Sequence, residues 1–254
     1  MFEQNNIGWA WWPLKKLGAN NPLQIPSNAN YAALLAYWNG ETNNPPIKAA
    51  AYNGLMELAA SARFEKNIIH RDVVDALMRQ PHSNAAIPFK SNIITDSIVL
   101  NAVDYDLGSN GIAYFDKDTA DYHIATQKRT AGNRGRVYRN DGVDIRKDSA
   151  KADSYYVSDI EDGEWLQYTV NVAQKGIYRL VFKIAADNNK GHIMLKDSDK
   201  ILLQNLPVPN TGSMQQWQSV NTANISLSAG IHALRVHVLQ GGFNLQTIQF
   251  VRVK

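Results

Sequence analysis

Residues 164–172 read Glu-Trp-Leu-Gln-Tyr-Thr-Val-Asn-Val, an alternation of apolar and polar side chains. A two-residue period is typical of a β-strand with one face in the core and one in solvent. The apolar series that begins with Leu166 and Tyr168 is expected in the core. Trp165 and Gln167 belong to the other series, so both are expected on the solvent side of the sheet.

The same period recurs on both sides of this stretch. Residues 178–184 and 234–238 alternate in the same way, with Arg235 and His237 on the polar side of the second run. Turn-forming pairs separate the runs: Asp162-Gly163, Lys175-Gly176, Ala229-Gly230 and Gly241-Gly242. Short alternating strands joined by such turns predict an antiparallel β-sandwich or barrel, and a mainly β protein.

Residues before about 90 have a different pattern. Segments 31–38, 49–63 and 70–79 are expected to be helices, and the apolar run 7–12, closed by Pro13, is expected to be a buried strand. The period changes near 88–92. We therefore expect two domains, residues 1–90 and 91–254, the first mostly helical.

Composition excludes several functional classes. The chain has 254 residues, a net charge of +3 and no cysteine, which excludes disulfides and thiol chemistry and argues against a nucleic-acid-binding face. No run approaches the ~20 apolar residues that span a bilayer, so no membrane partner is expected. The N-terminus lacks a signal peptide because Glu3 replaces its basic region. Either the chain is intracellular, or its true beginning lies upstream.

Several side chains are candidates for ligand contact. Trp165 beside Gln167 offers an apolar plate with polar neighbours, which suits the face of a pyranose ring. The alternative is that Trp165 packs under a loop. Asn244 follows Gly241-Gly242-Phe243 and is expected at a rim of the sandwich, whereas Trp217 is expected in the core or at a sheet edge.

The acidic residues between 104 and 121 form a further group. They are Asp104, Asp106, Asp116, Asp118 and Asp121. Carboxylates of this kind could bind calcium, but their spacing is not that of the helical calcium loop. The expected arrangement is therefore a solvated acidic face.

From about Thr95 to Lys254, the chain resembles a family 6 carbohydrate-binding module. The motifs that carry the resemblance are Asp104-Tyr105-Asp106-Leu107-Gly108, Gly111 to Asp116, Tyr138 to Ile145, Gly163 to Val172, and Gly241 to Leu245. The resemblance implies a jelly-roll β-sandwich that binds β-linked plant or algal polysaccharides or oligosaccharides. It also implies an associated structural calcium and an extracellular or periplasmic location.

Such modules bind sugar at two places. At the loop rim, the family Asn matches Asn244, but Asp159 and Met214 stand where relatives carry aromatic side chains. Tyr155 and Tyr156 are the candidate replacements, and Tyr156 is included in the expected site. On the sheet face, the family aromatic matches Trp165, and this is the favoured place. Val103 stands where relatives carry a calcium-binding Glu.

Residues 1 to about 80 resemble the C-terminal end of a glycoside hydrolase family 5 barrel, which is cellulase-like. Gly8-Trp9-Ala10-Trp11-Trp12-Pro13-Leu14-Lys15 resembles its last strand, where Trp12 matches a substrate-stacking Trp. A (β/α)8 barrel needs ~250 residues, and retaining hydrolysis needs two carboxylates ~5–5.5 Å apart. We find no convincing pair and name no catalytic residue.

The combined interpretation is a non-catalytic polysaccharide-binding module attached to the remnant of an endo-glycanase. The alternative is a fragment of an active endo-β-glucanase whose catalytic glutamates lie upstream of Met1. In that case, the upstream part of the barrel is a further expected partner.

Overall fold

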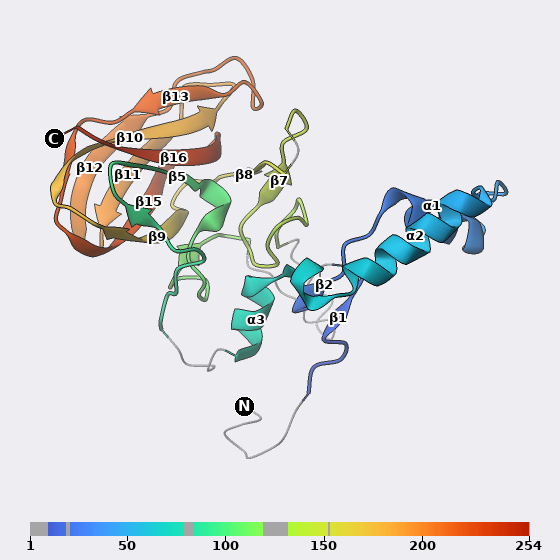
Figure 1. Ribbon diagram of the computed structural model, residues 1–254. Coiled ribbons are helices and arrows are strands. Elements are labelled where there is room, and N and C mark those ends of the chain that lie inside the picture. Colours follow the sequence, from blue (N-terminus) through green and yellow to red (C-terminus); the bar gives the residue numbers. More distant parts are fainter. Residues whose placement is uncertain (1–9, 19–20, 79–83, 119–131, 152, 254) are drawn as a thin grey trace, which may run out of the picture. The chain divides into compact units, whose positions relative to one another are not determined.

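The computed structural model describes residues 10–18, 21–78, 84–118, 132–151 and 153–253 (Figure 1). The chain divides into two compact units, Met1–Pro81 and His82–Lys254. The segment that follows residue 84 belongs to the second unit because Phe89 is buried there and Ile87 forms a β-bridge with Leu107. The change of sequence pattern near residue 90 therefore falls inside the second unit.

The first unit contains three α-helices and a small sheet. The helices are α1 (Ala29–Trp38), α2 (Lys48–Ser61) and α3 (Arg71–Met78), with a 3-10 helix at Phe64–Lys66. The strands β1 (Lys15–Lys16), β2 (Leu23–Gln24) and β3 (Ile68–Ile69) lie in the order β1-β2-β3. The three expected helices are confirmed. Asn28 caps α1, since its side chain accepts a hydrogen bond from the Tyr31 amide at 2.8 Å.

The expected strand at 7–12 is not confirmed. Residues 7–9 lie outside the described residues, and residues 10–12 are exposed and form no strand. Pro13 contributes to this outcome because it has no N–H to donate to a strand partner. Within the described part of this unit, Leu23 and Leu34 are the buried hydrophobic residues, whereas Trp12 is 92% exposed. The relation of this unit to a barrel remains a prediction.

The second unit is a β-sandwich, as expected. Its six-stranded sheet has the order β12-β11-β15-β9-β4, with β6 also paired to β9. These strands are β4 (Ile93–Ile94), β6 (Tyr114–Phe115), β9 (Trp165–Val172), β11 (His192–Asp197), β12 (Lys200–Pro207) and β15 (Gly230–Gln240). Figure 1 shows them in green to red.

The seven-stranded sheet has the order β13-β10-β16-β8-β7, with β14 paired to β10 and β5 to β16. Its strands are β5 (Ser97–Asn101), β7 (Ile145–Lys147), β8 (Tyr155–Val157), β10 (Gly176–Ala185), β13 (Gln218–Asn221), β14 (Ile225–Leu227) and β16 (Asn244–Arg252). A 3-10 helix, Ala102–Asp104, follows β5. No helix in the described part of the chain is long and apolar enough to cross a bilayer.

The core lies between the two sheets and follows the alternation seen in the sequence. Tyr168 and Val170 of β9 pack in one hydrophobic cluster with Leu180 of β10, Val236 of β15 and Phe250 of β16. Each of these residues is at most 2% exposed. The turn before β9 depends on Gly163, whose φ of +86° lies in the left-handed region that favours glycine.

Candidate functional site

The solvent side of the six-stranded sheet carries one group of side chains, which we call the Trp165 face: Trp165, Met194, Lys196, Arg235 and His237. The register of the strands brings them together. His237 of β15 lies opposite Trp165 of β9 and Met194 of β11. Arg235 lies opposite Gln167 of β9 and Lys196 of β11. Side chains of directly opposed residues lie on the same side of the sheet.

Trp165 is half-buried because Arg235 covers part of it. The guanidinium carbon of Arg235 lies 4.3 Å from the centre of the indole ring, a cation–π contact. The Nε–H of Arg235 donates to Oε1 of Gln167 at 2.8 Å. These two contacts fix the guanidinium over Trp165. The sequence placed Arg235 on the polar side of its strand but gave no reason to single it out.

Gln167 is buried, at 5% exposure, although the alternation placed it on the solvent side. Its Oε1 accepts from Arg235, and its Nε2 donates to the buried carboxylate of Asp106 at 3.0 Å. Both ends of the amide are therefore engaged within the protein. Gln167 positions Arg235 instead of presenting a free amide to a ligand.

His237 lies two residues after Arg235 on β15 and diagonally across from Lys196 on β11. Burial, followed by the positive charges of Lys196 and Arg235, lowers the pKa of His237 to about 4. The ring is therefore neutral at pH 7. The ring of His237 lies 6.0 Å from that of Trp165, at an angle of 40°.

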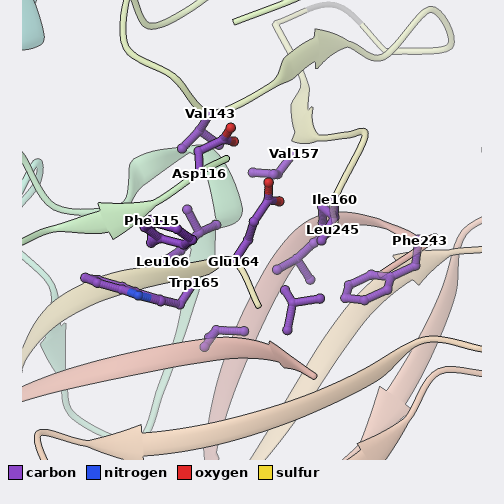
Figure 2. Close-up of a pocket in the computed structure, with 12 residues that line it drawn as sticks. Phe115, Asp116, Val143, Val157, Ile160, Glu164, Trp165, Leu166, Phe243 and Leu245 are labelled. Atoms are coloured by element: carbon purple, nitrogen blue, oxygen red, sulfur yellow. The ribbon is translucent and has the colours of Figure 1, made fainter. Parts of the chain in front are cut away.

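A small cavity lies beneath Trp165, at the end of the core (Figure 2). Its volume is about 20 Å³, which is room for one water molecule and not for a sugar. Asp116 and Glu164 lie beside apolar side chains here, and burial followed by the charge of Glu164 raises the pKa of Asp116 to about 8. Figure 2 shows that the indole of Trp165 extends away from both carboxylates.

A larger pocket, of about 630 Å³, lies at the rim of the sandwich. We call it the rim pocket; its lining includes Arg146, Tyr156, Asp159, Met214, Trp217 and Asn244. The rings of Tyr156 and Trp217 meet edge to face, with their centres 5.2 Å apart. They supply an aromatic wall in a pocket that charged side chains also line.

Asn244 is the polar anchor of the rim pocket. It is the first residue of β16 and is 3% exposed. Its Nδ2 donates to the Met214 carbonyl at 2.7 Å, whereas its Oδ1 is buried without a partner among the described residues. A buried acceptor without a donor costs about 1–3 kcal/mol, so this atom favours a ligand that brings a hydroxyl.

An ion pair forms the opposite wall. Arg146 and Asp159 are joined at 3.0 Å, and the Ser158 hydroxyl donates to Asp159 at 2.8 Å. Burial alone would raise the pKa of Asp159, but the hydrogen bonds from Ser158 and Arg146 outweigh it, and the pKa is lowered. The pair therefore presents charged donors and acceptors at the position where the sequence lacks an aromatic plate.

Residues 136–252 match the family model of the carbohydrate binding module (family 6). This part of the chain is similar to a family 6 carbohydrate-binding module. The match includes the strands β9, β11 and β15 of the Trp165 face. It also includes the lining of the rim pocket apart from Gly135. We refer to the second unit as the module from here on.

Solved structures with similarity to the chain include family 6 modules. The C-terminal module of a marine laminarinase from Zobellia galactanivorans is 21% identical, with a TM-score of 0.44, covering 62% of this chain and 100% of that one. A Clostridium stercorarium module in complex with cellobiose is 17% identical, with a TM-score of 0.45, covering 64% and 98%. A β-1,3-glucan-binding module from Bacillus halodurans is 17% identical, with a TM-score of 0.43, covering 64% and 99%.

The expected site residues fall in three places. Asn244 and Tyr156 meet in the rim pocket, together with Trp217, which the sequence assigned to the core or a sheet edge. Trp165 lies on the face of the six-stranded sheet, with Gln167 beneath Arg235. Trp12 belongs to the first unit. The polar neighbours of Trp217 concealed its role, because sequence alone does not show that it meets Tyr156.

The prediction of a solvated acidic face is wrong for three of its residues. Asp104, Asp106 and Asp116 are each at most 6% exposed. Asp104 accepts from Lys90 Nζ and Asn101 Nδ2, both at 2.9 Å, and also from Tyr138. Burial of Asp104 and Asp106 is tolerated because donors of the protein surround their carboxylates, whereas burial raises the pKa of Asp116 to about 8. Asp121 lies outside the described residues.

These contacts also decide the fit of a structural calcium, which the family resemblance implies. Lys90 already places a positive charge on Asp104, and the carboxylate of Asp106 is used by Gln167 and Thr169. Val103, at 2% exposure, offers no ligand oxygen from its side chain. Within the described ranges, no group of three or more acidic or histidine side chains could hold a metal ion. The residues described do not fit a calcium site.

Proposed function

We propose that the module binds a β-linked polysaccharide of plant or algal cell walls without cleaving it. The observation that carries the proposal is Asn244, which lines a pocket of about 630 Å³ and whose buried Oδ1 has no donor among the described residues. Sugars bring hydroxyl groups that donate to such an atom. The family match over residues 136–252 supports the same ligand class.

The rim pocket offers the contacts that a sugar needs. The C–H groups of a pyranose ring pack on the aromatic wall formed by Tyr156 and Trp217. Its hydroxyls donate to Asn244 and Asp159 and accept from Arg146. In this proposal Trp217, which is partly exposed, replaces the missing aromatic plate, and the buried Tyr156 supports it from beside.

We also propose a sugar contact at Trp165. Its indole is half-buried, and its strand neighbours hold it at a fixed place on the sheet. The carboxamide of Gln167 supports this surface through Arg235. The ligand contacts at this face are therefore assigned to Trp165 and Arg235.

Affinity gel electrophoresis tests the proposal, with laminarin, hydroxyethylcellulose, xylan and agarose in separate gels. Retarded migration in at least one gel is expected. Trp217→Ala should reduce the retardation if the rim pocket binds, and Trp165→Ala if the sheet face binds. Gln218→Ala, an exposed change on β13, is the matched control. Unchanged migration of the wild-type protein in every gel would refute the proposal.

A second proposal concerns residues 1–90, which we interpret as the remnant of a cellulase-like endo-glycanase. Exposed apolar residues outnumber the two buried ones in the described part of the first unit, which supports an origin in a larger domain. Its proposed sugar contact is Trp12, and its proposed partner is the upstream part of a barrel. Release of reducing sugar from β-glucans by this chain alone would favour the alternative, an active hydrolase fragment.

A further inference from the structure

We propose that the Trp165 face selects acidic sugars, with the carboxylate or sulfate group of the sugar held by Arg235 and Lys196. This inference rests on the proposed function and names a ligand class for one of its two surfaces. It is distinct from the rim pocket, where Arg146 is already paired with Asp159.

The first observation is a like-charge pair. Arg235 and Lys196 are directly opposed on neighbouring strands, and their side chains share the solvent side of the sheet. Directly opposed like charges destabilise a sheet. A bound anion would remove that repulsion.

The second observation is that no protein carboxylate neutralises the pair. Among the described residues, neither Arg235 nor Lys196 takes part in a salt bridge. The acidic groups that border these strands are committed elsewhere: Asp106 to Gln167 and Thr169, and Asp197 to His232 at 2.7 Å. The lowered pKa of His237 agrees, because Lys196 and Arg235 both contribute to it.

The third observation is the preorganisation of Arg235. Its Nε–H donates to Gln167 and its guanidinium carbon lies 4.3 Å from the centre of the Trp165 ring, whereas its two Nη groups have no partner among the described residues. A guanidinium fixed in this way binds a carboxylate or sulfate in a two-point geometry. The sugar ring that carries the anion would lie beside the indole.

The test compares ligands that differ only in charge: laminarin, laminarin oxidised to the C6 carboxylate, and sulfated laminarin, with cellohexaose and its glucuronate counterpart as a second series. Titration calorimetry at pH 7 should give at least tenfold tighter binding for an acidic member of either series. The advantage should shrink as salt rises from 20 to about 200 mM, because screening weakens exposed charge contacts.

Variants assign the effect to residues. Arg235→Gln and Lys196→Gln should each remove most of the acidic advantage, so that acidic and neutral ligands bind each variant with similar affinity. Lys196 lies on the sheet surface, so its substitution keeps the test valid if Arg235→Gln fails to fold. Lys183→Gln, on β10 of the other sheet, makes the same charge change and should have no effect.

The remaining outcomes are also decisive. Equal affinity for neutral and acidic ligands would overturn this inference and leave the proposed function standing. If Arg146→Gln abolished the acidic advantage instead, the preference for acidic ligands would belong to the rim pocket, and this inference would be overturned. A loss of similar size in Lys183→Gln would indicate general charge attraction and would also overturn it. Failure of all ligands to bind would overturn both proposals.

Discussion

Asn244 combines two opposed properties in one amide. Its nitrogen donates to the Met214 carbonyl, and its oxygen is buried without a donor among the described residues. The free protein therefore carries an energetic cost that a ligand hydroxyl would remove. This makes Asn244 the residue whose replacement separates binding from folding.

We expect Asn244→Ala to weaken glucan binding at the rim by roughly 5- to 30-fold, which corresponds to about 1–2 kcal/mol. The melting temperature should change little, because the substitution removes the unpaired oxygen along with the bond to Met214. Calorimetric titration and thermal unfolding measure the two effects. Full affinity in the variant would place the binding site elsewhere.

Asp116 gives the module a pH dependence of a defined sign. Its folded-state pKa of about 8 lies above the ordinary 3.8, so the folded state keeps a proton that the unfolded state has released. Stability from this group is complete below pH 3.8 and is lost as the pH rises towards 8. Glu164, Asp144 and Asp118 face it and oppose its ionisation.

Asp116→Asn should therefore raise the free energy of unfolding by about 1–3 kcal/mol at pH 8 and by little at pH 4. The amide oxygen can still accept the hydrogen bond from the Asp118 amide, which is 2.8 Å long in the wild-type protein. Urea unfolding at several pH values gives the comparison, with exposed Asp199→Asn as the control. Equal slopes with pH in the variant and the wild type would contradict the assignment.

At the scale of elements, β9 and β15 form the framework of the Trp165 face. The bond between Gln167 and Arg235 joins the two strands, and the bond from Gln167 to Asp106 joins β9 to the segment before β6. One buried side chain thus ties three segments together. Its loss would leave a buried carboxylate with fewer donors.

Gln167→Ala should destabilise the module by about 1–3 kcal/mol, because Asp106 and Arg235 each lose a buried partner. Asn171→Ala, an exposed change on the same strand, should stay within about 0.5 kcal/mol of the wild type. Chemical unfolding measures both. Equal stability of the two variants would show that the bond network has no net effect.

The two-residue period was sufficient to predict β9, β10 and β15 with the correct buried faces, because alternation reports burial along one strand. It could not predict that Gln167 is buried, since Arg235 covers it from a neighbouring strand. The place of Trp217 in the rim pocket could not be predicted for a related reason. Its partner Tyr156 lies 61 residues earlier, and only the folded chain brings the two rings within 5.2 Å.

At the scale of the whole molecule, stability is unevenly distributed. The large hydrophobic cluster lies wholly in the second unit, whereas the described part of the first unit buries Leu23 and Leu34. Burial of apolar surface is the main favourable contribution to folding. The sequence indicated two domains, but helical periodicity could not show how few apolar side chains the first would bury.

Residues 82–254 alone should therefore unfold cooperatively, with a melting temperature within about 5 °C of that of the full chain. Residues 1–81 alone should show no cooperative transition. Calorimetry and circular dichroism of the two fragments provide the measurement. An unfolded 82–254 fragment would mean that the module depends on the first unit.

The contact between Lys90 and Asp104 has a consequence for how the module is handled. The ammonium group of Lys90 is a counter-ion that is covalently part of the chain. A chelator therefore cannot remove it, and its local concentration does not depend on the buffer. A fragment that begins at residue 91 lacks both Lys90 and Phe89. A fragment that starts at residue 82 keeps the positive charge of Lys90. In a fragment that starts at residue 91, the buried carboxylate of Asp104 has lost that positive charge.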